Sequence, residues 1–452
     1  MQRDAITSLN NWIKSQKRRP LIIRGARQTG KSTLVRMFAQ AAQLELVEIN
    51  LERHAYLNET FATLDLNVIC PAIENITGKT FGAHSLLFLD EIQATPQALA
   101  ALRYFFEERP DLPVIAAGSL LELVLPDIDF AMPVGRIEYF HMGPFTFVEF
   151  LRAMGEFRVI NQLEAYVPGA PWAPTLHQRL INLLSVYMQV GGMPDPLACY
   201  VDDPKDSRRW MQAQQRIVDT YQDDFNKYRK RGDWAPILQQ VYLRLPAALS
   251  HKLKYTDLAP GQRVEKIHQA VDLLVAARVA LRASHVAPPK MPLAAHASAK
   301  VFKTYWLDIG LLGRISGWGS GTTDVSSGFN GLRAEQFVAQ HLAYMGAPMT
   351  GPELYYWLRE GKVNNAEVDF VAAITGLKHT QIVPVEVKSG PVSKMLSLKQ
   401  YVDAYQPPFA IRLHGGLPEV SVVGKTTLLS IPLYMVPYLG RIVEGYPWPK
   451  RR

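Results

Sequence analysis

The stretch that decides the fold is a Gly-rich loop ending in lysine and serine, Gly25-Ala26-Arg27-Gln28-Thr29-Gly30-Lys31-Ser32. It matches G-x-x-x-x-G-K-[ST] at every fixed position. An apolar run, Leu21-Ile22-Ile23, comes directly before it, and a helix-forming stretch with an apolar face begins at Lys31. Strand, loop and helix in this order predict a phosphate-binding loop (P-loop) at a helix N-terminus.

Each part of this loop has a chemical role. The glycines let backbone N–H groups turn inward toward phosphate oxygens. Lys31 reaches the β and γ phosphates, and Ser32 offers a hydroxyl to Mg²⁺. We therefore expect ATP and Mg²⁺ as cofactors, bound by Gly25, Ala26, Arg27, Gln28, Thr29, Gly30, Lys31, Ser32 and Thr33.

An acidic pair at the end of a second apolar strand is the expected partner of the loop. Leu86-Leu87-Phe88-Leu89-Asp90-Glu91 supplies it. Asp90 would hold Mg²⁺ directly or through water, and Glu91 would polarise the attacking water. The alternative is that the two acids only cap a buried strand, but their pairing with the loop favours hydrolysis.

Two further polar residues are candidates for the nucleotide site. Ser119, at the end of the next strand, stands where it can sense the γ phosphate, or it only satisfies a turn. Arg136 is a candidate for stabilising transition-state charge, within its own subunit or on a neighbour, and the alternative is a solvated side chain.

The wider pattern predicts a multidomain α/β protein. At roughly 150 residues per domain, 452 residues predict about three domains. Strands alternate with helices up to about residue 160, which indicates a parallel sheet with helices on both faces. Residues 161–300 read as mostly helical, and alternation returns in residues 301–452.

The middle segment has the outline of a winged helix-turn-helix. A short helix near 256–259, a Pro-Gly turn and a helix over 263–279 lead into a strand, and 288–300 reads as a wing or linker. Arg263, Lys266 and the basic cluster at 227–231 are candidate phosphate contacts, with a packing role as the alternative. We expect nucleic acid as a partner, DNA in preference to RNA.

A second set of charged residues lies near the C-terminus. Glu335 falls on a predicted helix, Asp369 on a predicted strand (366–374), and Glu386 and Lys388 on another (382–390). Residues two apart on a strand share a face. Asp369 and Glu386 could hold a second Mg²⁺ or Mn²⁺, and Glu335 and Lys388 could assist phosphodiester hydrolysis. An edge hairpin with solvated ion pairs is the alternative.

Composition narrows the setting. Lys plus Arg number 49 and Asp plus Glu 41, which gives a net charge of +8 and suits a polyanionic partner. Cys70 and Cys199 lie far apart without metal-type spacing, so we expect a reducing, cytoplasmic environment. The N-terminus lacks a signal-peptide pattern, and no apolar run reaches membrane-spanning length, so we expect a soluble protein without a membrane partner.

Taken together, the sequence resembles bacterial and archaeal AAA-type ATPases with a C-terminal domain of unknown function similar to PD-(D/E)XK nucleases. The likeness covers most of the chain and rests on blocks including GARQTGKST, LLFLDEIQ, VIAAGSLLE, QVGGMPDP, KTYWLDIGLL, GLRAEQFVAQHL, AEVDFV and VPVEVKSG. It implies an ATPase with Gly25, Gly30, Lys31, Ser32, Asp90 and Glu91 at its site. It also implies a nuclease-like set of Glu335, Asp369, Glu386 and Lys388. A departure is the stretched turn GKVNNA before Asp369.

Three functions are compatible with these residues. The first is a DNA-associated ATPase that repositions a nuclease-like domain. The second is a nucleotide-switched regulator that binds a partner or DNA without cutting it, and it would be favoured if Glu335, Asp369 and Glu386 did not converge on a metal. The third is a STAND-like signalling ATPase. The sequence leaves the oligomeric state open.

Overall fold

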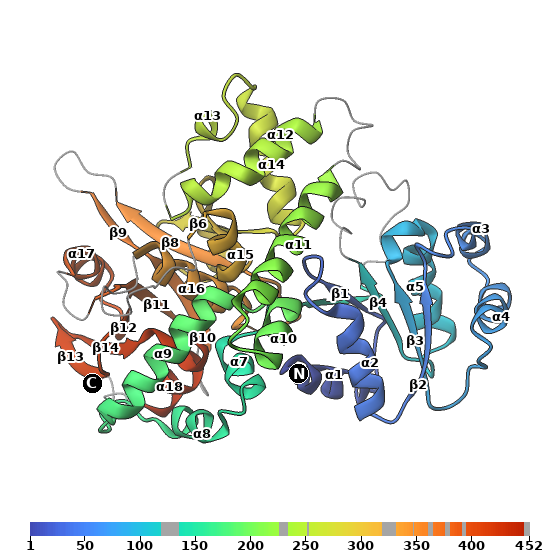
Figure 1. Cartoon of the computed structure of the whole chain (residues 1–452), viewed down its shortest axis with the longest axis horizontal. Coiled ribbons are helices and arrows are strands. Elements are labelled where there is room, and N and C mark those ends of the chain that lie inside the picture. Colours follow the sequence, from blue (N-terminus) through green and yellow to red (C-terminus); the bar gives the residue numbers. More distant parts are fainter. Residues whose placement is uncertain are drawn as a thin grey trace.

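The structure is a computed structural model that describes residues 1–118, 135–225, 234–250, 253–318, 331–346, 348–359, 365–375, 380–390 and 395–446. Within these ranges the strands form three sheets. One sheet lies at one end of the molecule and the other two at the opposite end, with helices α10 and α11 between them (Figure 1). Among the described residues, no helix combines the length and the apolarity that crossing a bilayer demands.

The N-terminal sheet is wholly parallel and has the order β2-β3-β4-β1-β5. Its strands are β1 (Leu21–Arg24), β2 (Glu45–Asn50), β3 (Ser85–Asp90), β4 (Val114–Gly118) and β5 (Glu138–His141). Every residue of β3 and β4 is buried, as expected for central strands covered on both faces. The predicted parallel α/β sheet is confirmed.

Helices cover both faces of this sheet. One face packs against α1 (Ala5–Ile13) and α2 (Lys31–Ala41). The other packs against α3 (Leu57–Ala62), α4 (Leu66–Thr77) and α5 (Pro96–Glu108), with a 3₁₀ turn η1 (Ile92–Ala94) between β3 and α5. Because strand residues alternate in direction, Leu86 and Phe88 join the first core, and Leu87 and Leu89 join the second.

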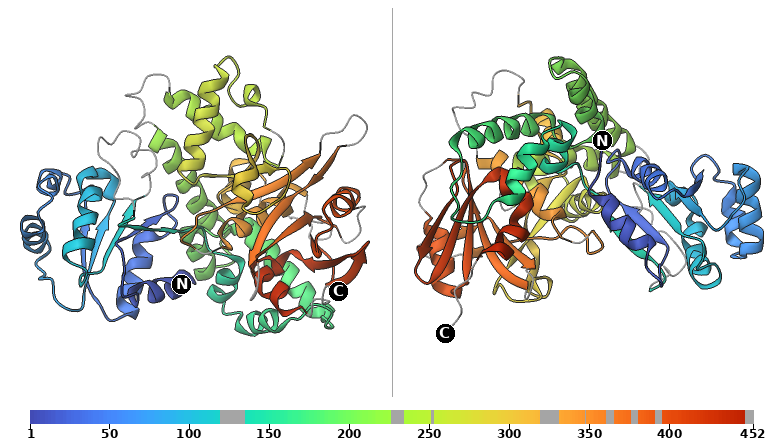
Figure 2. Two further views of the ribbon diagram at one scale, coloured as in Figure 1. Left: turned by 180° about the vertical axis from the view of Figure 1, so that it is seen from behind. Right: turned by 90° about the horizontal axis from the view of Figure 1, so that it is seen from below.

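Five helices follow the first sheet: α7 (Phe147–Ala153), α8 (Phe157–Ala165), α9 (Pro174–Val190), α10 (Pro194–Asp202) and α11 (Ser207–Phe225). Helix α7 begins with a capping box, in which Thr146 and Glu149 each bond the other's backbone N–H. The first four helices share a hydrophobic core with the C-terminal strands, and α9 lies along them (Figure 2). Helix α11 points back toward the P-loop.

The next segment contains the short helix, the longer helix and the strand expected there, in the expected order, together with further elements. They are α12 (Trp234–Arg244), η4 (Leu245–Ala248), α13 (Tyr255–Leu258), α14 (Val264–Ala276), β6 (Ala280–Val286), η5 (Leu293–His296) and β7 (Ala297–Trp306). Strands β6 and β7 form an antiparallel hairpin. Residue 300, where the sequence suggests a boundary, lies inside β7.

The C-terminal part completes two sheets. Its elements are α15 (Ile309–Ile315), α16 (Gly331–Tyr344), β8 (Leu354–Arg359), β9 (Ala366–Val368), β10 (Phe370–Thr375), β11 (Thr380–Val387), α17 (Leu396–Tyr405), β12 (Phe409–His414), β13 (Glu419–Val423), β14 (Thr426–Pro432), η7 (Leu433–Tyr438) and α18 (Leu439–Gly445). The strand orders are β7-β6-β8-β9 and β10-β11-β12-β14-β13. The middle hairpin is thus part of a C-terminal sheet.

One sequence expectation needs correction at Asp369. The single strand predicted over 366–374 is two strands, because β9 pairs with β8 whereas β10 pairs with β11. Asp369 lies at the break between the two sheets, and its Oδ2 accepts a hydrogen bond from the Val387 N–H at 2.7 Å. The side chain therefore takes the place of a backbone partner for β11 where the ladder is interrupted.

Candidate functional site

The loop between β1 and α2 has the tight geometry that its glycines predict. Gly30 has φ +91° and is the N-cap of α2, and this left-handed conformation favours glycine. A Cβ on Gly25 would lie 2.3 Å from the Met142 carbonyl oxygen, so a larger residue cannot occupy this position without moving the backbone. The loop therefore keeps its backbone close to the edge of the sheet and to the start of α2.

Lys31 is buried, with its ammonium among backbone carbonyls. Its Nζ donates to the carbonyl oxygens of Gly25 at 3.0 Å and Ala26 at 2.9 Å, and the side chain of Thr29 also donates to the Ala26 carbonyl. The lysine is 7% exposed. These bonds fix the ammonium inside the loop, where a phosphate held by the N–H groups at the start of α2 would meet positive charge.

The second half of the site meets the first through a direct hydrogen bond. Ser32 Oγ donates to Asp90 Oδ2 at 2.8 Å, and Asp90 ends β3 at the carboxyl edge of the sheet. Burial raises the pKa of Asp90 above its ordinary value, although the Ser32 bond acts in the opposite direction. A hydroxyl and a carboxylate side by side are hard oxygen ligands of the kind Mg²⁺ prefers, so these residues fit a magnesium ion.

Glu91 occupies an unusual backbone conformation next to this pair. Its φ of 53° and ψ of 47° are left-handed, which is uncommon outside glycine and asparagine. Its Oε2 accepts a 2.5 Å hydrogen bond from Gln93 Nε2. The strained turn and the glutamine together orient the Glu91 carboxylate beside Asp90, where the sequence predicts a water-polarising base.

The P-loop is also held from outside by helix α11, which the motif did not reveal. Arg27 Nη1 bonds both carboxylate oxygens of the buried Asp224, at 2.7 and 2.9 Å. The Tyr221 hydroxyl donates to the Arg27 carbonyl at 2.8 Å. Gln28 Nε2 donates to Thr220 Oγ1 at 3.3 Å. The loop is therefore joined to the helical region about 190 residues further along the chain.

The remaining candidates for the nucleotide site have different outcomes. Thr33 lies exposed in the first turn of α2. Arg136 precedes β5, so it lies at the amino edge of the parallel sheet, away from the P-loop, and its Nε bonds Glu107 at 2.8 Å. The structure does not bring Arg136 to the P-loop of its own chain, and an action on a neighbouring subunit stays a prediction. Ser119 lies outside the described residues.

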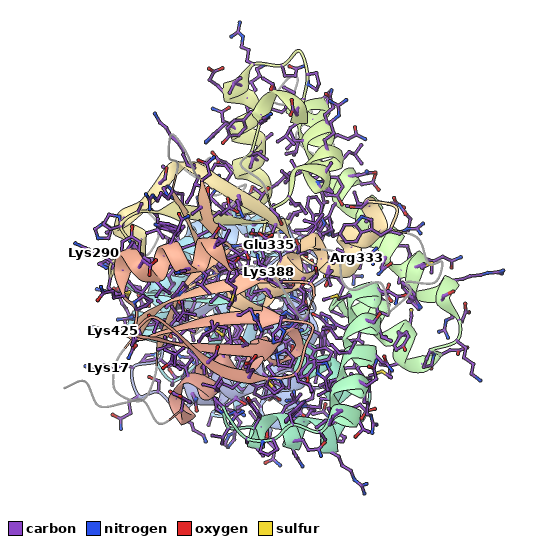
Figure 3. The ribbon with its side chains drawn as sticks, turned by 90° about the vertical axis from the view of Figure 1, so that its left-hand side faces the viewer. Lys17, Lys290, Arg333, Glu335, Lys388 and Lys425 are labelled. Atoms are coloured by element: carbon purple, nitrogen blue, oxygen red, sulfur yellow. The ribbon has the colours of Figure 1, made fainter. Side chains whose placement is uncertain are left out.

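The C-terminal candidates come together from three elements. Glu335 lies on α16, Asp369 lies at the β9–β10 break, and Glu386 and Lys388 lie at the end of β11. Lys388 Nζ pairs with Glu386 Oε1 at 2.6 Å, as expected for residues on one face. Electrostatic interactions connect Asp369 with Glu335, Glu386 and Lys388. Figure 3 shows Glu335 and Lys388 near the centre of one side of the molecule.

Three residues missed from the sequence complete this cluster. Lys303, on β7, is only 1% exposed, and its Nζ bonds Glu335 at 3.3 Å and also Glu367. The Tyr305 hydroxyl donates to the same Glu335 oxygen. The sequence signal for Lys303 is a lysine inside the apolar run VFKTYW. This run precedes the E-x-K motif by more than 80 residues, so no local pattern connects the two.

Burial and mutual repulsion shift the titration of this cluster. Burial, followed by the charge of Glu335, raises the pKa of Asp369 to about 7. Burial and then the charge of Asp369 raise the pKa of Glu386 to about 7. Burial disfavours the Lys303 ammonium, yet Glu335, Glu367 and Asp369 together raise its pKa above the ordinary value. The two lysines therefore stay protonated at neutral pH, and the pKa values of Asp369 and Glu386 lie near that pH.

Metal binding fits the two sites unequally. In the part of the chain that the structure describes, no three or more His, Cys, Asp or Glu side chains are arranged to hold a metal ion. At the P-loop this matters little, because Ser32, Asp90 and a nucleotide phosphate would share the ligands. In the C-terminal cluster the protein would have to supply the ligands itself, and the acids there are already bonded to lysines and to a backbone N–H.

The middle segment leaves its candidate phosphate contacts at the surface. Arg263 is exposed as the N-cap of α14, and Lys266 is half-buried one turn later. The basic cluster at 227–231 lies outside the described residues. Nucleic-acid contact by this segment remains a prediction.

Comparison with known proteins divides the chain in three. Residues 17–151 match a family model described as an AAA domain. Residues 181–322 and 330–434 match two further models, each described as a domain of unknown function, DUF8612 and DUF4143. Comparison with curated proteins found no match. Among solved structures, the ORC2 protein of Aeropyrum pernix, in ADPNP–ADP complexes, is 13% identical with a TM-score of 0.34, covering 70% of this chain and 92% of that chain.

The family match and the site geometry agree for the N-terminal part. Residues 17–151 match an AAA domain and have the parallel sheet, the Gly-rich loop and the acidic strand end of a P-loop nucleotide-binding fold. The other two matches carry no stated activity. The winged-helix and nuclease-like interpretations of the middle and C-terminal parts therefore remain predictions.

Proposed function

We propose that this chain is a Mg²⁺-dependent ATPase whose nucleotide state controls a C-terminal domain that associates with nucleic acid. The observation that carries the ATPase part is the Ser32–Asp90 hydrogen bond, with Glu91 next in the chain. It places the expected magnesium ligands together at the carboxyl edge of the sheet, where doubly wound α/β proteins bind nucleotides.

In this mechanism, residues of the chain position the nucleotide phosphates and polarise the attacking water. Backbone N–H groups of the loop and the Lys31 ammonium bind the phosphates, and Ser32 and Asp90 hold Mg²⁺, which neutralises charge on the phosphate oxygens when it is bound. Glu91, oriented by Gln93, accepts a hydrogen bond from the attacking water and draws its proton toward the carboxylate.

The test separates binding from hydrolysis. Lys31→Ala should abolish both ATP binding and turnover, because it removes the cation inside the loop. Glu91→Gln should retain ATP binding and lower turnover by about 10²- to 10⁴-fold, the usual contribution of a general base. Lys14→Ala, at an exposed lysine, is the matched control. Unchanged turnover in Lys31→Ala would refute the assignment.

A link from the nucleotide to the rest of the chain is supported by α11. Asp224, Tyr221 and Thr220 all contact the P-loop from this helix. Helix α11 packs against α15, and Gln215 on α11 accepts a hydrogen bond from Arg314 on α15 at 2.7 Å. A nucleotide that rearranges the loop would therefore act first on α11.

Nucleic-acid association is supported by the net charge of +8 and by the order of α12, α13, α14, β6 and β7, which suits a winged helix. Fluorescence anisotropy with labelled DNA and RNA, with and without ATP, tests it. We expect tighter binding to DNA, with an affinity that falls steeply as salt is added. Arg263→Ala and Lys266→Ala should weaken binding and reduce the salt dependence. Binding that does not respond to salt would argue against phosphate contact.

A second candidate function is metal-dependent cleavage of a phosphodiester by the C-terminal cluster. The gathering of Asp369, Glu386 and Lys388 favours it. Nicking of DNA with Mg²⁺ or Mn²⁺ should then be lost in Asp369→Ala and in Lys388→Ala. The bonds that Asp369 and Glu386 already make to protein donors favour instead the regulator that binds without cutting, in which wild type and both variants leave DNA and RNA intact. A STAND-like signalling role is one form of this regulator.

A further inference from the structure

The ammonium group of Lys303 is buried and is bonded by carboxylates, unlike that of a typical surface lysine. It projects from β7, its side chain is 1% exposed, and its ammonium bonds carboxylates from two other elements, Glu335 on α16 and Glu367 on β9. The ring of Tyr356 lies 5.1 Å from the ammonium nitrogen. A buried ammonium is costly unless opposite charges surround it, and here they do.

One oxygen of each acid in the C-terminal cluster is already bonded to a donor group of the protein. Glu335 Oε1 accepts from Lys303 and from the Tyr305 hydroxyl. Asp369 Oδ2 accepts from the Val387 N–H, and Glu386 Oε1 pairs with Lys388. Glu386 Oε2 is buried and has no hydrogen-bond partner, and the Glu386 side chain is only 4% exposed. One oxygen of each acid thus accepts from a protein donor, and Glu386 Oε2 is a buried acceptor without a partner among the described residues.

From this arrangement we propose that Lys303 is the resident cation of the C-terminal cluster and keeps the cluster free of a divalent metal ion. The lysine belongs to the segment matched at 181–322, whereas Glu335, Asp369 and Glu386 belong to the segment matched at 330–434. The wing-like hairpin therefore supplies the ion that completes the C-terminal site.

This inference rests on the non-cleaving form of the proposed function, and it explains why the acids and Lys388 can assemble without forming a metal site. Removing the Lys303 charge should create one. With a methionine at 303, Glu335 and Glu367 lose their counterion, and Asp369 lies within electrostatic reach of the vacated position. Two carboxylates without a counterion would then attract a divalent ion, and carboxylate oxygens are donors that Mn²⁺ prefers.

The experiment measures Mn²⁺ binding to the full-length, nucleotide-free protein by the loss of the free-ion EPR signal. The proteins are wild type, Lys303→Met, Lys303→Arg, Asp369→Asn and Lys303→Met with Asp369→Asn. Any Mn²⁺ held by Ser32 and Asp90 is common to all five, so the comparison with Asp369→Asn isolates the C-terminal cluster.

We expect wild type, Lys303→Arg and Asp369→Asn to bind Mn²⁺ alike. Lys303→Met should gain one ion per chain, bound at least tenfold more tightly than any C-terminal ion in wild type, and the double variant should lose it. The proposal is overturned by a wild-type ion that Asp369→Asn removes, or by a folded Lys303→Met without a gain. If Lys303→Met does not fold, the comparison of Mn²⁺ binding between wild type and Asp369→Asn still tests the proposal, because a C-terminal ion lost in Asp369→Asn would overturn it. ATPase and DNA-binding assays on the same proteins are independent of this readout, so the failure of either function is distinguished from failure here.

Discussion

The P-loop site and the C-terminal cluster use the same residue types in opposite ways. Both combine acids with buried or half-buried lysines. At the P-loop, Lys31 donates to backbone carbonyls, so Ser32 and Asp90 are left to bond each other. In the C-terminal cluster, Lys303 and Lys388 donate to carboxylates. The first arrangement leaves oxygen ligands available for a metal ion, and the second uses them to neutralise the protein's own charge.

The difference shows that a list of residue types does not define a metal site. Whether a carboxylate can bind a metal ion also depends on whether its oxygens already accept hydrogen bonds from groups of the protein. Glu386 and Lys388 satisfy the E-x-K pattern and share a face, yet they pair with each other at 2.6 Å. At the P-loop site, the Lys31 ammonium bonds two backbone carbonyls, and Asp90 accepts a hydrogen bond from Ser32. An acidic pattern therefore predicts a metal only when nearby cations are bonded elsewhere.

The largest expected effect concerns the stability of the two lysine environments. Lys303→Met should lower the free energy of unfolding by about 3 kcal/mol, because it leaves the largely buried Glu335 and the partly exposed Glu367 without their counterion. Lys31→Met should cost only about 1 kcal/mol in the nucleotide-free protein, because the bonds from Lys31 Nζ to Gly25 and Ala26 end on neutral backbone carbonyls. Urea unfolding followed by tryptophan fluorescence measures both.

Lys303→Arg is the control for this comparison, since it keeps the charge and should recover part of the loss. Added Mn²⁺ should raise the stability of Lys303→Met more than that of Lys31→Met. Equal losses for the two methionine variants would mean that the environments do not differ in the way described.

The next prediction concerns the contact between helix α7 and helix α16. His341 on α16 is buried, its Nε2 accepts from the Phe147 N–H at the start of α7, and its Nδ1 lies 2.8 Å from the Phe337 carbonyl. This pair of contacts requires the neutral ring with its proton on Nδ1. Burial accordingly lowers the pKa of His341 to about 4.

Because the folded-state pKa lies below the ordinary value, the unfolded chain binds more protons between these two pH values. The stability due to His341 is complete above pH 6.5 and is lost as the pH falls toward 4. The full loss is on the order of 3 kcal/mol. In His341→Gln, which keeps an acceptor for the Phe147 N–H, acidification should cost correspondingly less. Urea midpoints at pH 7.5 and 4.5 test this, since other histidines titrate equally in both proteins. Identical pH slopes would exclude His341 as the source.

A site made of residues close together in the sequence could be predicted, whereas a site assembled from distant strands could not. The P-loop needs eight consecutive residues and one strand end, so spacing alone predicted its residues and their partner Asp90. The parallel sheet was predictable because its central strands are continuous apolar runs. Lys303 and Glu367 were not, because only the tertiary pairing of β7 with β6, of β6 with β8 and of β8 with β9 places their strands in one sheet near Glu335. The strand break at Asp369 likewise depends on which sheet each half joins.

The smallest expected effect tests whether the P-loop is as self-contained as its motif implies. Arg27 and Asp224 join the loop to α11, and their side chains are 28% and 8% exposed. A double-mutant cycle with Arg27→Met and Asp224→Asn should give a coupling energy of about 1 kcal/mol. The matched control is Arg36 with Glu48, also joined by two hydrogen bonds but 54% and 26% exposed, where solvent screening should limit the coupling to about 0.3 to 0.5 kcal/mol.

Repeating the cycle with bound ATP extends the comparison to function. If nucleotide binding rearranges the loop against α11, the Arg27–Asp224 coupling energy should change when ATP is added, whereas the Arg36–Glu48 coupling should not. A coupling equal in both states, and no larger than the control, would mean that α11 only lies beside the loop. The signal from the nucleotide would then have to leave the ATPase domain by another contact, such as the Phe147–His341 bond.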